Sequence, residues 1–137
     1  MADTVQRVEY FYVQVPNKVG EGARYLSALS EAGVNLLAFT GFPEGRGSQL
    51  DFVPSDPGAF RAFARRAKWK VTGPKRAFLL SGDDRIGVVA DLHARLAAAR
   101  INVTAIDALC AGGGRYGALL WVAPRDFNKA AARLGAS

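Results

Sequence analysis

The sequence predicts an α+β protein built from two tandem ferredoxin-like units of the form βαββα(β), each an antiparallel sheet with its helices on one face. Three observations lead to this fold class. The 137-residue chain matches itself when it is shifted by sixty-seven positions without a gap. The hydrophobic period changes in the same order in both copies, and turns rich in glycine recur at matching places. We expect the first unit at residues 7–73 and the second at 75–135.

The internal repeat joins residues of several chemical types through turns and helices alike. The identical pairs include Gly20 with Gly87, Asn35 with Asn102, Pro57 with Pro124, and Phe60 with Phe127. One register held over such a length indicates one supersecondary unit used twice.

Each copy begins with an alternating apolar run, Val8–Val15 or Ala77–Leu80, which is typical of a strand. A helix follows, because apolar residues then recur with a period of 3.6. Gly33 suits a left-handed stop at the end of the first such helix. Arg100 takes that place in the second copy, so we expect the helix to end there in a different way.

The second half of each copy predicts a hairpin and another helix. Val34–Phe42 is strand-like, and the reversals PEGRG and AGGGRYG lead into the apolar stretches Gln49–Val53 and Ala118–Val122. Pro57 and Pro124 then suit the first turn of a helix, where a missing N–H is tolerated.

One further strand, Trp69–Thr72, follows the first copy only, so the second unit is expected to lack its last strand. We expect Lys68–Thr72, reversed by a Gly73-Pro74 turn, to pair with the first strands of both units. This pairing would remove an open edge. It predicts one continuous seven-stranded sheet with that segment in the middle.

The composition is that of a soluble globular protein, with half of the residues apolar and 22% charged. No apolar run approaches the eighteen or more residues of a membrane span, and no leader is evident, so a cytoplasmic location is expected. Cys110 is the single cysteine and His93 the single histidine. We therefore expect no disulfide, no metal site and no cofactor.

The net charge of +6 is concentrated in one region. Seven basic residues and no acidic one lie between Pro57 and Gly82. Such a region can attract nucleic acid, an acidic protein or an anionic metabolite. Arg61, Arg65 and Lys68 are spaced as one face of a helix, however, and a solvated helix face is the favoured explanation.

A known family shares this pattern of a strand, a short loop ending in Gly20 or Gly87, an amphipathic helix, Ala-Gly-Val-Asn at residues 32–35 and a second strand. From Val8 to Leu134 the chain resembles two tandem ACT domains. ACT domains are regulatory modules that bind amino acids and other small effectors. The resemblance implies a regulatory, amino-acid-binding protein, and it implies a homodimer, since ACT-like units usually act as pairs or rings.

The loops before the two first helices are the expected binding site. Each delivers main-chain N–H groups at a helix N-terminus, where the partial positive charge favours a carboxylate, and side-chain oxygens nearby can accept from an ammonium group. The expected ligand-binding residues are Asn17, Lys18, Val19, Gly20 and Asn35 in the first unit, and Asp84, Arg85, Ile86, Gly87 and Asn102 in the second. The neutral Asn17 should favour an anion, whereas Asp84 can cap its own helix and compete with one.

The glycines, the two asparagines and Asp84 also have a purely structural explanation. The glycines can simply turn the chain, Asn35 and Asn102 can start strands, and Asp84 can be only a cap. Catalysis is not expected, because a chain with one histidine and one cysteine supplies few partners for acid–base or nucleophilic chemistry.

The alternative function is a basic ferredoxin-like module that binds nucleic acid or an acidic protein. It is the less favoured one: in RYGALLWV, Tyr116 and Trp121 point to opposite faces of the strand and form no stacking platform.

Overall fold

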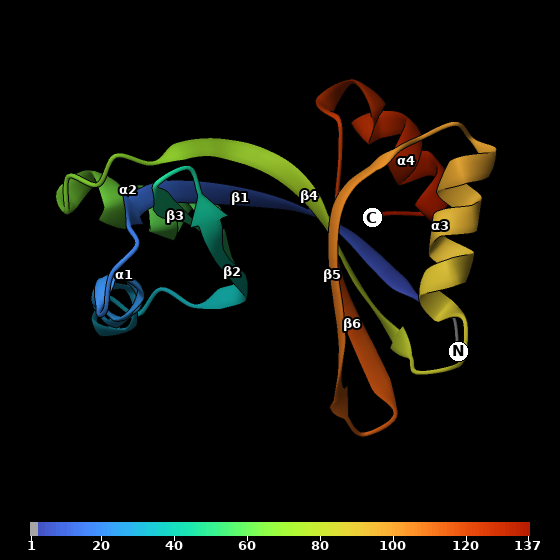
Figure 1. Cartoon of the computed structure of the whole chain (residues 1–137), viewed down its shortest axis with the longest axis horizontal. Coiled ribbons are helices and arrows are strands. Elements are labelled where there is room, and N and C mark those ends of the chain that lie inside the picture. Colours follow the sequence, from blue (N-terminus) through green and yellow to red (C-terminus); the bar gives the residue numbers. More distant parts are fainter. Residues whose placement is uncertain (1–2) are drawn as a thin grey trace. The chain divides into compact units, whose positions relative to one another are not determined.

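The computed structural model describes residues 3–137, which form one six-stranded antiparallel sheet and four α-helices (Figure 1). The strands are β1 (Thr4–Pro16), β2 (Leu36–Glu44), β3 (Gly47–Pro54), β4 (Thr72–Asp83), β5 (Val103–Gly112) and β6 (Arg115–Val122). The helices are α1 (Glu21–Glu31), α2 (Pro57–Arg66), α3 (Val88–Ala98) and α4 (Phe127–Leu134), with a 3-10 turn at Pro124–Asp126. None of these helices is both long enough and apolar enough to cross a membrane.

The chain divides into two compact units, each with its own hydrophobic core. The 9–75 unit contains α1 and α2. The 76–137 unit contains α3 and α4 and includes residues 3–8, so β1 and β4 each contribute to both units. The expected mixture of helices with an antiparallel sheet is confirmed.

The predicted seven-stranded sheet is wrong in its number of strands. The strand order is β2-β3-β1-β4-β6-β5, and Lys68–Thr72 is not a separate strand in the middle. Gly73 and Pro74 do not reverse the chain, because β4 runs through both. A Cβ at Gly73 would lie 2.8 Å from the Tyr10 carbonyl oxygen, so this glycine permits close approach to β1 instead of making a turn.

No strand follows α4 within residues 3–137, and the place of a fourth strand in the second unit is filled by another segment of the chain. Residues 3–8 belong to the 76–137 unit, and β1 is the neighbour of β4 in the sheet. Val5, near the start of β1, packs in the core of this unit. The N-terminal end of β1 therefore takes the place beside β4 that would otherwise be an open edge.

The offset of sixty-seven residues between the two copies becomes sixty-eight in the second strand of the hairpins. Phe11 pairs with Phe52 in the first copy. Its counterpart Phe78, sixty-seven residues later, pairs with Leu120, which lies sixty-eight residues after Phe52. The extra residue is Ala111, at a register shift of β5 that separates Cys110 from Gly112. A bulge of this kind bends the strand locally and redirects its side chains.

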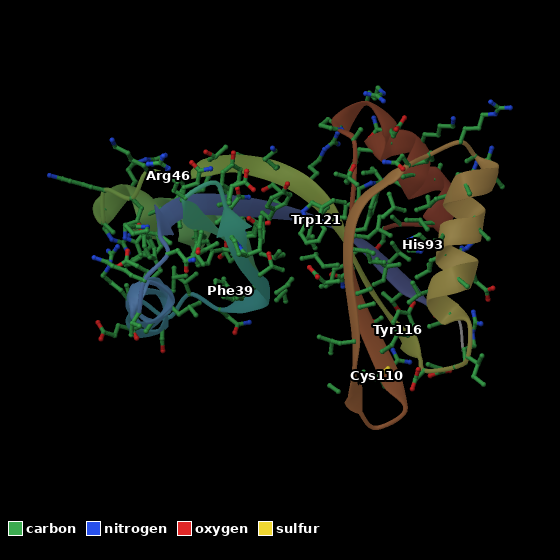
Figure 2. The ribbon with its side chains drawn as sticks, viewed as in Figure 1. Phe39, Arg46, His93, Cys110, Tyr116 and Trp121 are labelled. Carbon is green, nitrogen blue, oxygen red and sulfur yellow. The ribbon has the colours of Figure 1, made fainter. Side chains whose placement is uncertain are left out.

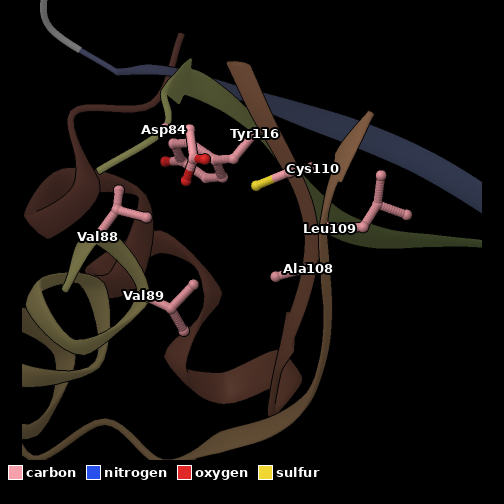
Figure 3. A pocket seen from close by; sticks show the side chains of 7 residues that line it. All are labelled: Asp84, Val88, Val89, Ala108, Leu109, Cys110 and Tyr116. Carbon is pink, nitrogen blue, oxygen red and sulfur yellow. The ribbon is translucent and has the colours of Figure 1, made fainter. Parts of the chain in front are cut away.

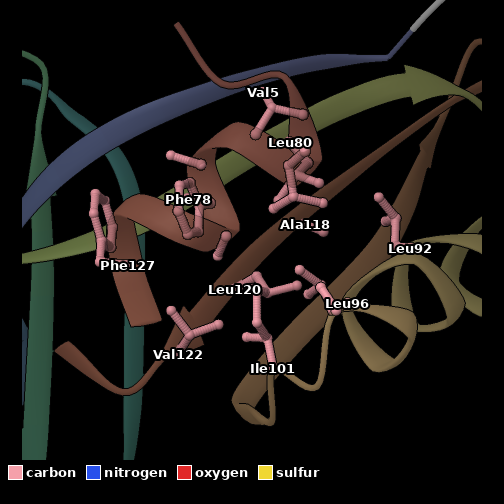
Figure 4. Packing of buried hydrophobic residues seen from close by; sticks show 14 of the residues in the cluster. Val5, Phe78, Leu80, Leu92, Leu96, Ile101, Ala118, Leu120, Val122 and Phe127 are labelled. Carbon is pink, nitrogen blue, oxygen red and sulfur yellow. The ribbon is translucent and has the colours of Figure 1, made fainter. Parts of the chain in front are cut away.

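Two stacked phenylalanine pairs hold the helices to the sheet. Phe11 stacks on Phe60 of α2 at 4.8 Å between ring centroids, and Phe78 stacks on Phe127 of α4 at 4.4 Å. In the 76–137 unit, alternate residues of β6 enter the same core as apolar residues of α3 and α4 (Figure 4). Both helices therefore cover one face of these strands, as Figure 1 shows.

All four helices end on a residue with a left-handed backbone. Gly33 and Gly135 have φ of 73° and 69°, and the basic residues Lys68 and Arg100 have φ of 58° and 59°. At Arg100, the N–H of Ile101 donates to the carbonyl of Leu96 at 2.9 Å, which is the bond of a glycine-type helix stop. The expectation that this helix ends in a different way is wrong, since the arginine adopts the glycine conformation itself.

Candidate functional site

The loop before α1 leaves the N-terminus of this helix without a side-chain cap. Gly20 occupies the N-cap position with φ of 93°, and no side chain of the described residues accepts from the first turn there. Lys18 donates its main-chain N–H to Pro16 at 3.0 Å, which closes the loop. The side chain of Val19 is 102% exposed, so it makes no contact with the core.

The loop before α3 repeats this geometry. Gly87 is the N-cap residue with φ of 85°, and α3 likewise has no side-chain cap within residues 3–137. Asp84 therefore does not cap this helix; its main-chain N–H donates to the Gly114 carbonyl at 2.8 Å. Ile86, the counterpart of Val19, is also 102% exposed. Main-chain N–H groups at such a terminus attract anions.

The two asparagines do not join these loops within their own units. Asn35 and Asn102 follow the C-terminal ends of α1 and α3, while the loops precede the N-terminal ends. An eleven-residue helix is about 16 Å long, which is too far for one small ligand to span. The main-chain oxygen of Asn35 accepts from the Ser55 N–H at 3.0 Å, which ties the start of β2 to the end of β3.

A pocket of about 150 Å³ lies beside the first turn of α3 in the 76–137 unit (Figure 3). It is lined by Asp84, Val88, Val89, Ala108, Leu109, Cys110 and Tyr116. Of these seven, sequence reasoning selected Asp84 alone as a binding residue. The β5 and β6 residues were missed because their approach to the helix depends on the hairpin register and on the bulge after Cys110.

Tyr116 is the buried polar residue of this pocket. Its side chain belongs to the core of the 76–137 unit and the residue is 4% exposed, yet its hydroxyl makes no close hydrogen bond among the described residues, the Asp3 carboxylate being its more distant partner. Burial raises the pKa of Tyr116, and the nearby Asp3 carboxylate raises it further. The hydroxyl is therefore protonated at neutral pH and retains its capacity to donate and accept.

Cys110 faces the same end of the pocket from the neighbouring strand and pairs with Tyr116 across β5 and β6 (Figure 3). A hydrogen bond with the Asp84 carboxylate raises the pKa of the Cys110 thiol, and burial adds to this effect. The thiol therefore stays protonated near neutral pH. A protonated thiol is a poor nucleophile, so this residue is not an activated one.

The basic residues near the pocket are already paired with carboxylates other than Asp84. Arg85 contacts Asp91 at 2.8 Å, and Arg115 contacts Asp83 at 2.8 Å. The bond from Arg115 lowers the pKa of the Asp83 carboxyl. Asp84 has no ion-pair partner in the part of the chain that the structure describes, so it is the uncompensated charge at the pocket.

The first turn of α1 is chemically different. Glu21 and Arg24 form an ion pair at 2.9 Å, and the hydrogen bond from Arg24 lowers the pKa of Glu21. Glu21 is the repeat counterpart of Val88, which lines the pocket beside α3. The two helix N-termini thus share their backbone geometry but differ in the side chains around them.

The residues considered for other functions make no site. His93 lies half-buried on α3, where its Nδ1 is 3.0 Å from the Val89 carbonyl oxygen (Figure 2). Tyr116 lies under the helices, while Trp121 follows at an odd spacing on the other face of β6. In residues 3–137, no group of three His, Cys, Asp or Glu side chains gathers where it could hold a metal.

The sequence matches no protein-family model and no curated protein. The fold matches solved structures along nearly the whole chain. The protein BT0572 from Bacteroides thetaiotaomicron superposes with a TM-score of 0.80 at 15% identity, covering 97% of this chain and 88% of that one. A structure of aspartokinase alpha and beta subunits gives 0.66 at 16% identity, covering 98% and 95%. The ligand-free regulatory subunit of aspartate kinase from Thermus thermophilus gives 0.65 at 14% identity, also covering 98% and 95%.

At these identities the likeness concerns the fold. The chain has an ACT-like fold, and its neighbours include the regulatory subunits of aspartate kinase. The fold expected from the resemblance of the sequence is confirmed at this level.

Proposed function

We propose that this protein is a regulatory protein that binds a small effector, an amino acid in the first instance, and has no catalytic activity of its own. The observation that carries the proposal is the uncapped, glycine-headed N-terminus of α1 and of α3, repeated in both units. A zwitterionic ligand suits such a terminus, because its carboxylate takes the main-chain N–H groups. The ACT-like fold of regulatory subunits adds support.

The proposed state of assembly is a homodimer. The strands β2 and β5 are the two ends of the sheet order, so each has one edge without a neighbour in the chain. Leu37, Phe39 and Phe42 on β2 and Leu109 on β5 are exposed apolar residues. Edges of this kind are usually covered by pairing with another chain. Sedimentation equilibrium at several concentrations tests this part: a monomer at every concentration would contradict it.

The test of binding is a melting screen of the whole chain against the twenty amino acids. A ligand present at about a hundred times its dissociation constant stabilises the folded state by about 2.7 kcal/mol, which is a clear shift of melting temperature. A shift with one or a few amino acids supports the proposal. No shift with any of them, together with a salt-sensitive shift caused by a short RNA or DNA, would replace it with the nucleic-acid function.

A further inference from the structure

We propose that the pocket beside α3 binds a small aliphatic amino acid, with the ligand's ammonium group at Asp84 and its side chain between the helix and β5. This inference rests on the proposed function and narrows it to one unit and one class of ligand. It concerns the seven pocket residues defined above, all within the 76–137 unit.

The size and walls of the pocket select the body of the ligand. Its walls are largely the aliphatic side chains of Val88, Val89 and Ala108, whereas the Leu109 side chain points away from the helix (Figure 3). The pocket has a volume of about 150 Å³ and is open to solvent, because Asp84, Ala108, Leu109 and Cys110 are exposed. A branched aliphatic side chain fits this volume.

The polar end of the pocket selects an ammonium group. The Asp84 carboxylate interacts with the Cys110 thiol there, and Tyr116 lines the same pocket from β6 (Figure 3). An ammonium group has three donors and no acceptor, and the carboxylate and the thiol offer oxygen and sulfur acceptors. The Tyr116 hydroxyl is nearly fully buried and makes no close hydrogen bond among the described residues, where the Asp3 carboxylate is its more distant partner; a buried polar group in this state is usually completed by a ligand or water.

The distribution of charge argues against acidic ligands. Arg85 and Arg115 are held by Asp91 and Asp83, which leaves Asp84 as the uncompensated charge. A second carboxylate on the ligand's side chain would lie among aliphatic residues without a basic partner. The main-chain N–H groups at the N-terminus of α3 suit the α-carboxylate, so both charges of a zwitterion find complementary groups.

The same position in the 9–75 unit lacks these features. Asn17 replaces Asp84, and Gly22 and Gly41 replace Val89 and Ala108. In the strand pairing, Ser48 takes the place of Tyr116, because Ser48 pairs with Val15 as Tyr116 pairs with Gly82. We therefore assign the aliphatic ligand to the 76–137 unit.

Titration calorimetry of the whole chain with alanine, valine, leucine, lysine and aspartate tests the inference. Valine or leucine should bind, and lysine and aspartate should not. Asp84→Asn should weaken the binding of valine by about ten- to a hundredfold, as expected for a lost hydrogen bond to a charged group. Asp107→Asn is the matched control, since Asp107 is an exposed carboxylate of β5 outside the pocket, and it should leave the affinity unchanged.

A second variant keeps the test independent of charge. Ala108→Leu fills the pocket from an exposed position of β5, so it should abolish binding while the chain still folds. Binding of lysine or aspartate in place of valine would overturn the inference and leave the proposed function standing. A larger loss from Asn17→Ala than from Asp84→Asn would overturn it as well, because the ligand would then lie in the 9–75 unit. No binding of any amino acid would overturn both.

Discussion

Replacing Tyr116 by phenylalanine should make the ligand-free protein more stable. The phenol ring packs in the core of the 76–137 unit, and phenylalanine retains all of that ring. The change removes only the hydroxyl, which is buried and makes no close hydrogen bond among residues 3–137, with Asp3 as its more distant partner. Buried groups of this kind oppose folding because they lose water and gain little in exchange.

The size of the effect follows from the cost of an unsatisfied polar group. Such a hydroxyl destabilises the folded state by about 1–3 kcal/mol, so Tyr116→Phe should raise the free energy of unfolding by about that amount. For a chain of this length, each kcal/mol changes the melting temperature by about 3–4 °C. We therefore expect a rise of at least about 3 °C, together with weaker binding of valine.

Calorimetric melting of the wild type and the variant, without ligand and at pH 7, measures this difference. Tyr25→Phe is the control, because Tyr25 is half-buried and its ring packs against Trp69. Removing the Tyr25 hydroxyl should alter the free energy of unfolding by less than about 0.5 kcal/mol. A fall in the melting temperature of Tyr116→Phe would contradict this expectation, since it would mean that the interaction of the hydroxyl with Asp3 outweighs the cost of its burial.

Three further predictions concern the helix ends, the core and the thiol. Arg100→Gly should stabilise the protein by about 0.5–1 kcal/mol in denaturant unfolding. The left-handed backbone costs arginine about 1–2 kcal/mol, and glycine relieves this cost but also gives the unfolded chain more conformational entropy, which offsets part of the gain. A loss of stability would show that the arginine side chain is needed there. Phe127→Ala should destabilise by about 3–5 kcal/mol in the same assay, since it removes a stacked core ring, and a loss below 1 kcal/mol would contradict the packing. Cys110 should react with iodoacetamide more slowly than free cysteine at pH 8, and Asp84→Asn should speed the reaction, because the carboxylate raises the pKa of the thiol; equal rates in the two proteins would contradict that contact.

The raised pKa of Cys110 also fixes the sign of a pH effect. Its folded pKa lies above the ordinary value of 9.0, so the folded state keeps the proton more firmly than the unfolded state does. The contribution to stability is present below pH 9 and is lost as the pH rises through the folded pKa. Cys110→Ser should reduce the slope of the free energy of unfolding against pH in the alkaline range. An unchanged slope would mean that groups other than Cys110 cause the loss of stability at alkaline pH.

Local patterns in the sequence predicted most of the secondary structure, because the periods of apolar residues depend only on neighbouring positions. These patterns gave wrong predictions where contacts between segments far apart in the sequence determine the structure. Gly73 resembles a turn residue, yet it serves the close approach of β4 to β1. The place beside β4 is filled from the start of the chain, which no pattern near the second copy reveals.

The candidate site was predictable only in part, for the same reason. The loops before α1 and α3 are signalled by glycines close to helix starts, and their uncapped geometry follows from those residues. Asn35 and Asn102 are equally regular in the sequence, but the length of each helix separates them from the loops. Tyr116 was considered only as part of a nucleic-acid stacking platform, whereas its burial and its place in the pocket depend on tertiary packing.

A titration of isotope-labelled protein with valine, followed by amide chemical shifts in NMR, tests binding at the pocket beside α3 directly. We expect the largest shifts on the N–H groups of Gly87, Val88 and Val89 and on the facing residues Cys110 and Tyr116. Shifts confined to the loop at residues 17–20, or none at a valine concentration that saturates calorimetric binding, would contradict this expectation.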